Sequence, residues 1–128
     1  MVDTAGMAQT SIAEFKKALS ETDEVKLTVT GRTSGRDTSR PVWFVQDGDT
    51  LYLLPVTGSD SVWFKYALRT PTIRLTADAI AISAAARPVT PAPRVRDVVE
   101  KFRAKYGADE VKKYYSKLDV AVEVMLAA

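Results

Sequence analysis

Residues 25–56 read VKLTVTGRTSGRDTSRPVWFVQDGDTLYLLPV, and this stretch decides the fold. Over residues 24–30, apolar residues alternate with polar ones, which is the period of a half-buried β-strand. Residues 41–46 and 50–56 are also strand-like, and the Asp-Gly-Asp sequence at 47–49 between them is a strong turn signal. The stretch therefore predicts three strands, of which the last two form a hairpin.

The flanking sequence adds helices and further strands. Apolar spacings of three and four predict helices at 11–19, 61–68, 95–106 and 107–117. Alternation and apolar runs predict strands at 73–75, 79–89 and 120–126. Because most connections are too short for parallel crossovers, we predict an α+β, mainly antiparallel fold, a barrel of about six strands with packed helices. It occupies one domain over residues 1–128, and residues 1–10 are expected to be a flexible lead-in.

The composition excludes several kinds of chemistry. The 128 residues contain no Cys and no His, which excludes disulfides, thiolate nucleophiles, Ser-His-Asp triads and the usual zinc sites. A reaction on this chain would therefore need a bound organic cofactor, and no metal site is expected. The net charge of +2 is too balanced to predict a nucleic-acid partner. With no apolar run long enough for a membrane span and no secretory signal at the start, we expect a cytoplasmic protein.

The most informative segment is the loop GRTSGRDTSR at residues 31–40. Its glycines let backbone N–H groups turn toward an anion, its hydroxyls can donate, and its three arginines can form bidentate bonds to phosphate. The same composition also suits a solvated hairpin loop, and the spacing alone leaves both interpretations open. It is not a Walker A sequence.

Two further groups of residues are candidates for a site. In residues 55–63, PVTGSDSVW, a strand end leads through a Gly-Ser turn into a helix, which exposes backbone donors where a flat ring can lie. The alternative is a plain connection with Trp63 in the core. Tyr114 and Tyr115 follow each other on a predicted helix and point about 100° apart, so at most one belongs to the core.

The order and content of these segments resemble the split β-barrel flavin- and deazaflavin-dependent oxidoreductases, especially the deazaflavin-dependent nitroreductases. In that family a strand ends in Thr-x-Gly-Arg/Lys-x-Ser-Gly-Lys/Arg, which corresponds to TVTGRTSGR at 28–36. A Pro-Leu-x-Tyr-Val-x-Asp-Gly-Asp strand corresponds to PVWFVQDGD at 41–49, and Trp-Tyr-x-Asn-Leu-x-x-Asn-Pro-x-Val corresponds to WFKYALRTPTI at 63–73. The resemblance covers residues 24–128.

This resemblance implies a split barrel that binds FMN or coenzyme F420 and transfers hydride to a small unsaturated, quinone or nitro-type acceptor. In the family the basic loop faces the cofactor's phosphate and the strand-end segment lines its ring. The residues carried over for phosphate are Arg32, Ser34, Gly35, Arg36 and Arg40. Those carried over for the ring are Pro55, Val56, Thr57, Gly58, Ser59 and Trp63. The family often has an arginine where Thr38 stands, and Arg40 lies on the same face of a strand two residues later.

Other functions fit the same residues. One alternative is a non-catalytic module that carries a flavin, a heme or a similar planar ligand. Another is a barrel without cofactor whose basic loop meets a phosphate of a nucleic acid or a protein. For the reductase, Tyr114 and Tyr115 are the candidates to contact the acceptor, by stacking and by hydrogen bonding to an oxygen that gains charge. A homodimer is expected by analogy with related split barrels.

Overall fold

The computed structural model describes residues 4–30 and 37–126. In this part of the chain six strands close a barrel in the order β1-β2-β3-β6-β5-β4, and every neighbouring pair is antiparallel. The strands are β1 (Glu24–Thr30), β2 (Asp37–Asp47), β3 (Thr50–Leu53), β4 (Thr72–Ala77), β5 (Ile80–Val89) and β6 (Ala121–Met125). The predicted α+β fold with a mainly antiparallel barrel is confirmed.

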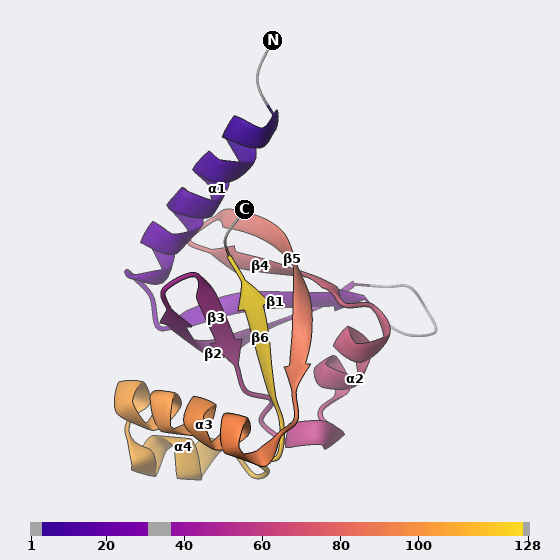
Figure 1. Ribbon diagram of the computed structural model, residues 1–128, viewed down its shortest axis with the longest axis vertical. Helices are drawn as coiled ribbons and strands as arrows, with labels where there is room; N and C mark the ends of the chain where they lie inside the picture. Colours follow the sequence, from indigo (N-terminus) through magenta and orange to yellow (C-terminus); the bar gives the residue numbers. More distant parts are fainter. Residues whose placement is uncertain (1–3, 31–36, 127–128) are drawn as a thin grey trace.

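Helices cover the barrel on several sides (Figure 1). They are α1 (Thr4–Leu19), α2 (Val62–Arg69), α3 (Ala92–Tyr106) and α4 (Ala108–Tyr114), with a short 3₁₀ turn, η1 (Gly58–Asp60), before α2. Helix α1 contacts β4 and β5, α2 contacts β1 and β5, and α3 lies against α4 and β2. No helix in the described part of the chain combines the length and apolar composition of a membrane span.

Two apolar clusters hold these layers together. The larger one fills the barrel, where Leu27, Phe44 and Leu75 are almost completely buried and where α1 and α2 each insert apolar side chains. The second lies between the barrel and helices α3 and α4, around Phe102 and Val111. Burying one such large side chain contributes about 1.5–3 kcal/mol. The second cluster therefore fixes the place of α4, which forms one side of the site described below.

Several boundaries differ from the prediction. Helix α1 begins at Thr4, well before the predicted start at residue 11. Strand β3 ends at Leu53 rather than at 56, since Pro55 has no N–H for a ladder. Helix α4 ends at Tyr114 rather than at 117.

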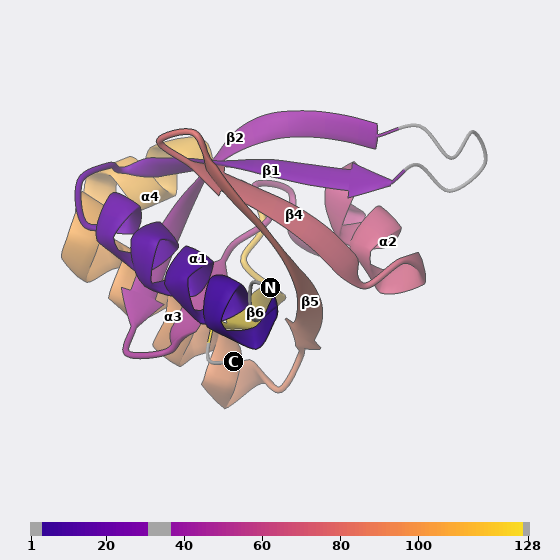
Figure 2. The ribbon, with the colours of Figure 1, turned by 90° about the horizontal axis from the view of Figure 1, so that it is seen from above.

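The described part of the 31–40 loop also differs from the prediction. Strand β2 already begins at Asp37, so Thr38 to Arg40 pair with β1 instead of belonging to the loop. Seen from above, β1 and β2 lie side by side along one edge of the molecule (Figure 2). Strand β3 pairs only with residues 44–47 of β2. In the described residues the earlier part of β2 therefore has one unpaired edge, where Pro41 is tolerated.

Candidate functional site

A cavity of about 580 Å³ opens where β2, the β3–α2 connection and the end of α4 meet. Its walls come from three parts of the chain that are far apart in the sequence. The β2 wall consists of residues 40–43, the turn wall belongs to residues 56–63, and Tyr114 and Tyr115 form the third side. The volume and the aromatic lining are typical of sites for small organic molecules.

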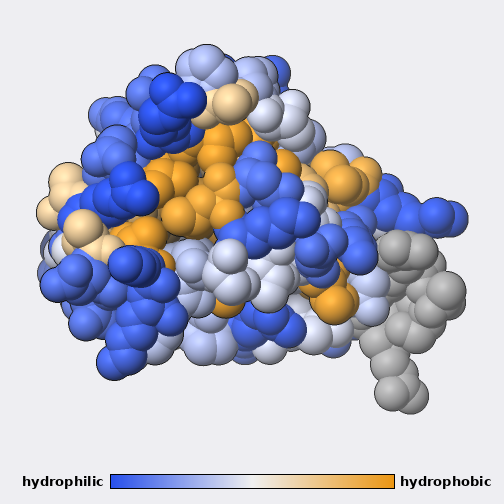
Figure 3. Space-filling model, turned by 90° about the horizontal axis from the view of Figure 1, so that it is seen from below, coloured by the Kyte–Doolittle hydropathy of each residue, from blue (hydrophilic) through white to orange (hydrophobic). Residues whose placement is uncertain are grey.

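Exposed apolar side chains gather around this cavity. In the described residues, five large hydrophobic side chains are markedly exposed, and three of them line it: Val56 at 48%, Val62 at 54% and Tyr114 at 49%. The face of the molecule seen from below also carries a patch of apolar side chains bordered by polar ones (Figure 3). Soluble proteins seldom leave such side chains together in solvent unless the place binds something. The geometry therefore marks the cavity as a binding site.

Trp43 forms the aromatic centre of the β2 wall. Its ring stacks on Tyr106, with 4.2 Å between centroids and 8° between planes, and Tyr114 meets it edge-on at 5.4 Å. The sequence analysis did not single out Trp43. The alternation of side chains along the predicted strand could have indicated it. Trp43 and Phe44 must point to opposite faces of this strand, and Phe44 points into the barrel core. Trp43 must therefore lie on the outer face, where a large aromatic ring needs another partner.

Tyr106 fixes the position of Trp43 through its hydroxyl group. This oxygen accepts a hydrogen bond from the Phe44 N–H at 3.1 Å and lies 2.8 Å from the carbonyl oxygens of Phe44 and Asp23. Burial raises the pKa of Tyr106 to about 12. Lys105 also donates to the Phe44 carbonyl, at 2.9 Å. Tyr106 thus joins α3 to β2 and to the start of β1 as a neutral phenol.

The two adjacent tyrosines diverge as predicted. Tyr115, the first residue after α4, is 7% exposed and belongs to the second apolar cluster. Burial raises its pKa above the ordinary value. Tyr114, at the end of α4, presents its ring to the cavity and to solvent. Both line the cavity, but Tyr114 is 49% exposed, and its hydroxyl has no hydrogen-bond partner among the described residues.

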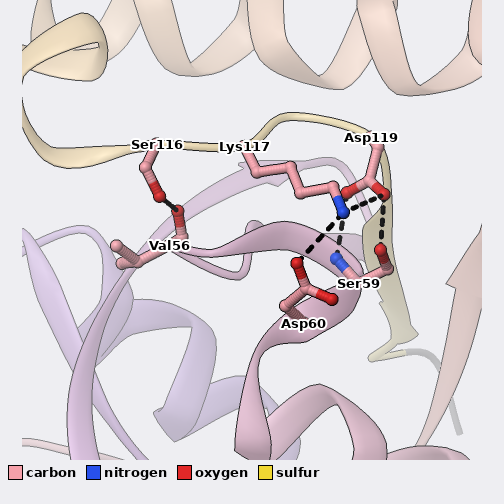
Figure 4. A network of polar contacts seen from close by, with 6 residues as sticks. All are labelled: Val56, Ser59, Asp60, Ser116, Lys117 and Asp119. Carbon is pink, nitrogen blue, oxygen red and sulfur yellow. Dashed lines mark hydrogen bonds and ion pairs between the residues drawn. The ribbon is translucent and has the colours of Figure 1, made fainter.

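The turn wall is held from behind by Asp119, which precedes β6 (Figure 4). The backbone N–H of Ser59 donates to one carboxylate oxygen at 2.9 Å, and its hydroxyl donates to the other at 2.5 Å. These bonds, the hydroxyl's first, hold the pKa of the Asp119 carboxyl below its usual range. Lys117 pairs with Asp60 at 3.1 Å and lies 3.7 Å from Asp119. The sequence analysis did not identify Asp119, since nothing near it in the sequence marks a site.

Charge at the cavity is mixed. Arg40 lines it, is exposed, and its guanidinium group makes no hydrogen bond or ion pair with the described residues. The acidic residues Glu24 and Asp60 also line it, and the Asp60 carboxylate is paired with Lys117. A flat ring against the aromatic walls, with an anionic group toward Arg40 and N–H donors toward the carboxylates, fits this set of residues. In the described part of the chain no group of three acidic side chains is placed to hold a metal ion.

A family model described as "Uncharacterized protein conserved in bacteria (DUF2255)" matches residues 16–124, most of the chain. The chain belongs to the DUF2255 family. A search of curated proteins finds no match. The description of this family names no activity, so the chemistry of the site is argued from its residues.

Solved structures similar to this DUF2255 chain share its fold. An F420-H2 dependent reductase, FDR-A, is 19% identical over 80% of this chain and 93% of its own, with a TM-score of 0.62. A putative pyridoxamine 5'-phosphate oxidase from Listeria innocua is 16% identical over 89% and 91%, with a TM-score of 0.65. The heme storage protein HutZ from Vibrio cholerae is 14% identical over 88% and 87%, with a TM-score of 0.65. The predicted resemblance to the split β-barrels is thus confirmed for the fold.

The DUF2255 chain brings part of the predicted site together. The predicted residues that line the cavity are Arg40, Val56, Thr57, Trp63, Tyr114 and Tyr115. Pro55, Gly58 and Ser59 do not line it: Pro55 and Gly58 are buried, and both donors of Ser59 are bound to Asp119. The predicted phosphate contacts in the 31–40 loop other than Arg40, which are Arg32, Ser34, Gly35 and Arg36, lie outside the described residues.

Proposed function

We propose that the cavity binds the ring system of FMN or F420 and that the chain is a cofactor-dependent reductase. When bound, the reduced cofactor supplies the hydride, and the acceptor is a small unsaturated, quinone or nitro-type compound. The observation that carries the proposal is the gathering of Val56, Val62 and Tyr114, all about half exposed, around one aromatic cavity with a free arginine. A planar, anionic ligand is the class of molecule that covers all of these groups at once.

Each part of the cavity has a role in this proposal. The ring of Trp43 provides flat apolar surface and excludes water from one side of the ligand, and Trp63, which is 3% exposed, supports the wall beside it. Arg40, together with the arginines of the 31–36 loop, binds the phosphate. The hydroxyl of Tyr114 donates a hydrogen bond to the acceptor oxygen that gains negative charge. The protein thus orients the reactants and stabilises charge.

The chain contains its own probe for binding. It has two tryptophans, and both line the cavity. Titration with FMN and, in parallel, with F420 should therefore quench most of the tryptophan fluorescence at saturation. Lack of saturable quenching by either compound would overturn the proposal.

The arginines are tested by two variants and a control. Arg36→Ala and Arg40→Ala should each weaken binding by about 1.5–3 kcal/mol, the range for hydrogen bonds to a charged group. Arg96→Ala is the matched control, because Arg96 is exposed on α3 and does not line the cavity. Riboflavin, which lacks the phosphate, should bind all four proteins about equally. Equal FMN affinity of the variants and the wild type would place the phosphate elsewhere.

A carrier of a planar ligand is the second candidate function, and the similarity to the heme storage protein HutZ favours it. The chain has no His or Cys to coordinate heme iron, which favours a flavin-type ligand over heme. Turnover separates the two functions. The quantity to measure is the rate at which a nitro or quinone acceptor oxidises reduced FMN or F420, with and without the protein. A reductase raises this rate, whereas a carrier binds the cofactor and does not raise it.

A further inference from the structure

Residues 116–119, the segment that leads into β6, contact the turn wall from both ends of that segment (Figure 4). Near the first end, Ser116 donates its backbone N–H to the Val56 carbonyl at 2.9 Å. Near the other, Asp119 binds the backbone N–H and the hydroxyl of Ser59. The two segments therefore run together behind the cavity.

Ser59 is the point at which this support acts on the wall. Its neighbours Thr57 and Asp60 line the cavity, whereas Ser59 does not and directs both donors at Asp119. Ser59, which is held by Asp119, thus lies between two residues that line the cavity within one short turn. A shift of Ser59 must move the lining residues on either side of it, because they share its backbone.

The contact behind the wall is also sterically close. Gly58 has a φ of +59°, and a Cβ there would lie 2.1 Å from a carboxylate oxygen of Asp119 and 2.9 Å from the Lys117 carbonyl oxygen. The backbone of the wall thus lies directly on the Asp119 side chain. Only glycine allows both the left-handed backbone and this approach.

We propose that Asp119 is a positioning residue that sets the shape of the turn wall for ligand binding. It does not touch the ligand itself, since it does not line the cavity. The identity of the ligand, FMN or F420, rests on the proposed function. The effect of Asp119 on the shape of the turn wall does not depend on which ligand binds.

The position of Asp119 favours a role in shape over one in overall stability. Its side chain is 39% exposed, and that of Lys117 is 44% exposed, so their ion pair contributes little to folding. Most of the folding free energy comes from the two apolar clusters, to which neither residue belongs. In a variant that stays fully folded, a change in ligand affinity reports a change of the folded cavity once the loss of one charge is controlled for.

The test compares Asp119→Asn with Asp97→Asn. Asparagine keeps the size of the side chain but has one acceptor oxygen for the two Ser59 donors. Asp97 is an exposed carboxylate on α3 that does not line the cavity, and its substitution controls for the loss of one charge. In D119N the Kd for FMN or F420, whichever binds the wild type more tightly, should rise about tenfold, the size of one lost hydrogen bond to a charged group. D97N should bind like the wild type.

A second measurement needs no ligand. In the Trp43→Phe background only Trp63 fluoresces, and this residue closes the turn wall and is 3% exposed. Introducing D119N there should increase the quenching of Trp63 by acrylamide, while urea unfolding shows both proteins fully folded at zero denaturant. A change in quenching with no FMN or F420 binding by the wild type would overturn the proposed function and support the role of Asp119. Unchanged quenching together with unchanged affinity would overturn that role.

The route through Ser59 is tested by a double-mutant cycle. Ser59→Ala removes one of the two donors, and Ser59→Thr keeps both. If Asp119 acts through Ser59, the affinity losses of D119N and S59A are less than additive, and S59T restores most of the wild-type affinity. Full additivity would show that Asp119 acts by another route and would overturn the inference.

Discussion

Trp43 contacts tyrosines on two sides, and the two sides use the phenol hydroxyl differently. On the core side, Tyr106 stacks on the indole and its hydroxyl is saturated by Phe44 and Asp23. On the cavity side, Tyr114 meets the same indole edge-on and is half exposed, and its hydroxyl makes no hydrogen bond with the described residues.

This difference separates structural aromatic residues from residues available for a ligand. The sequence predicts that Tyr114 and Tyr115 point to different sides of a helix, but nothing in it distinguishes Tyr106, Tyr114 and Tyr115 by the partners of their hydroxyl groups. The structure distinguishes them by whether the hydroxyl has a protein partner and whether the ring is covered. Substitutions that disturb the core side should therefore change stability, and those on the cavity side should change binding or turnover.

The largest effect is expected for Tyr115→Ala. Tyr115 is nearly buried in the second cluster and contacts both Trp43 and Phe102. Removing a buried aromatic ring costs about 3–5 kcal/mol, because the cavity left behind collapses only in part. Urea unfolding of the variant measures this loss. A loss below about 1 kcal/mol would place Tyr115 with Tyr114 on the cavity side.

Tyr106→Phe should have the next largest effect. It keeps the stacked ring but leaves the Phe44 N–H without its phenol partner, which costs about 1–3 kcal/mol. Tyr52→Phe is the control, since the Tyr52 hydroxyl makes no hydrogen bond with the described residues. Equal unfolding free energies for the two variants would contradict a structural role of the Tyr106 hydroxyl.

The same hydroxyl predicts a smaller effect at alkaline pH. The pKa of Tyr106 is raised by burial from 10.0 to about 12, so above pH 10 the unfolded chain releases a proton that the folded chain retains. Stability is therefore fully present below pH 10 and falls as the pH rises toward 12. Burial raises the pKa of Tyr115 too, so part of the fall persists in Tyr106→Phe. Unfolding free energies of wild type and Y106F between pH 9 and about 12 should converge, and parallel curves would refute the assignment.

Much of the fold follows from local pattern in the sequence. The alternation in residues 24–30 and the Asp-Gly-Asp turn suffice for three strands, because a strand period and a glycine with φ of +61° at Gly48 are local properties. The turn between β4 and β5 is different. Asp78 and Ala79 both have positive φ, +48° and +69°, and alanine gives no signal for a turn that normally contains glycine.

The site is less predictable than the fold because its walls meet only in three dimensions. The turn wall was predicted through Val56, Thr57 and Trp63, since a strand-to-helix junction is visible in the sequence. Trp43 and Asp119 were missed. Their roles depend on contacts with partners about 60 residues away, Tyr106 for Trp43 and Ser59 for Asp119, and no local spacing encodes such contacts.

Tyr114→Phe is expected to have the smallest effect on stability and a specific effect on function. The hydroxyl has no partner among the described residues, so its removal should change the unfolding free energy by less than about 0.5 kcal/mol. The ring remains in place against Trp43, and FMN or F420 affinity should be nearly unchanged. If the hydroxyl donates to the acceptor oxygen, turnover with a nitro or quinone acceptor falls, because a hydrogen bond that strengthens as charge develops acts on the rate. Tyr115→Phe, which alters the neighbouring residue whose ring packs in the second apolar cluster, should leave turnover unchanged. Full turnover in both variants would make Tyr114 a wall of the cavity only, and the acceptor would then be oriented by other groups that line it, such as Ser61 or Thr57.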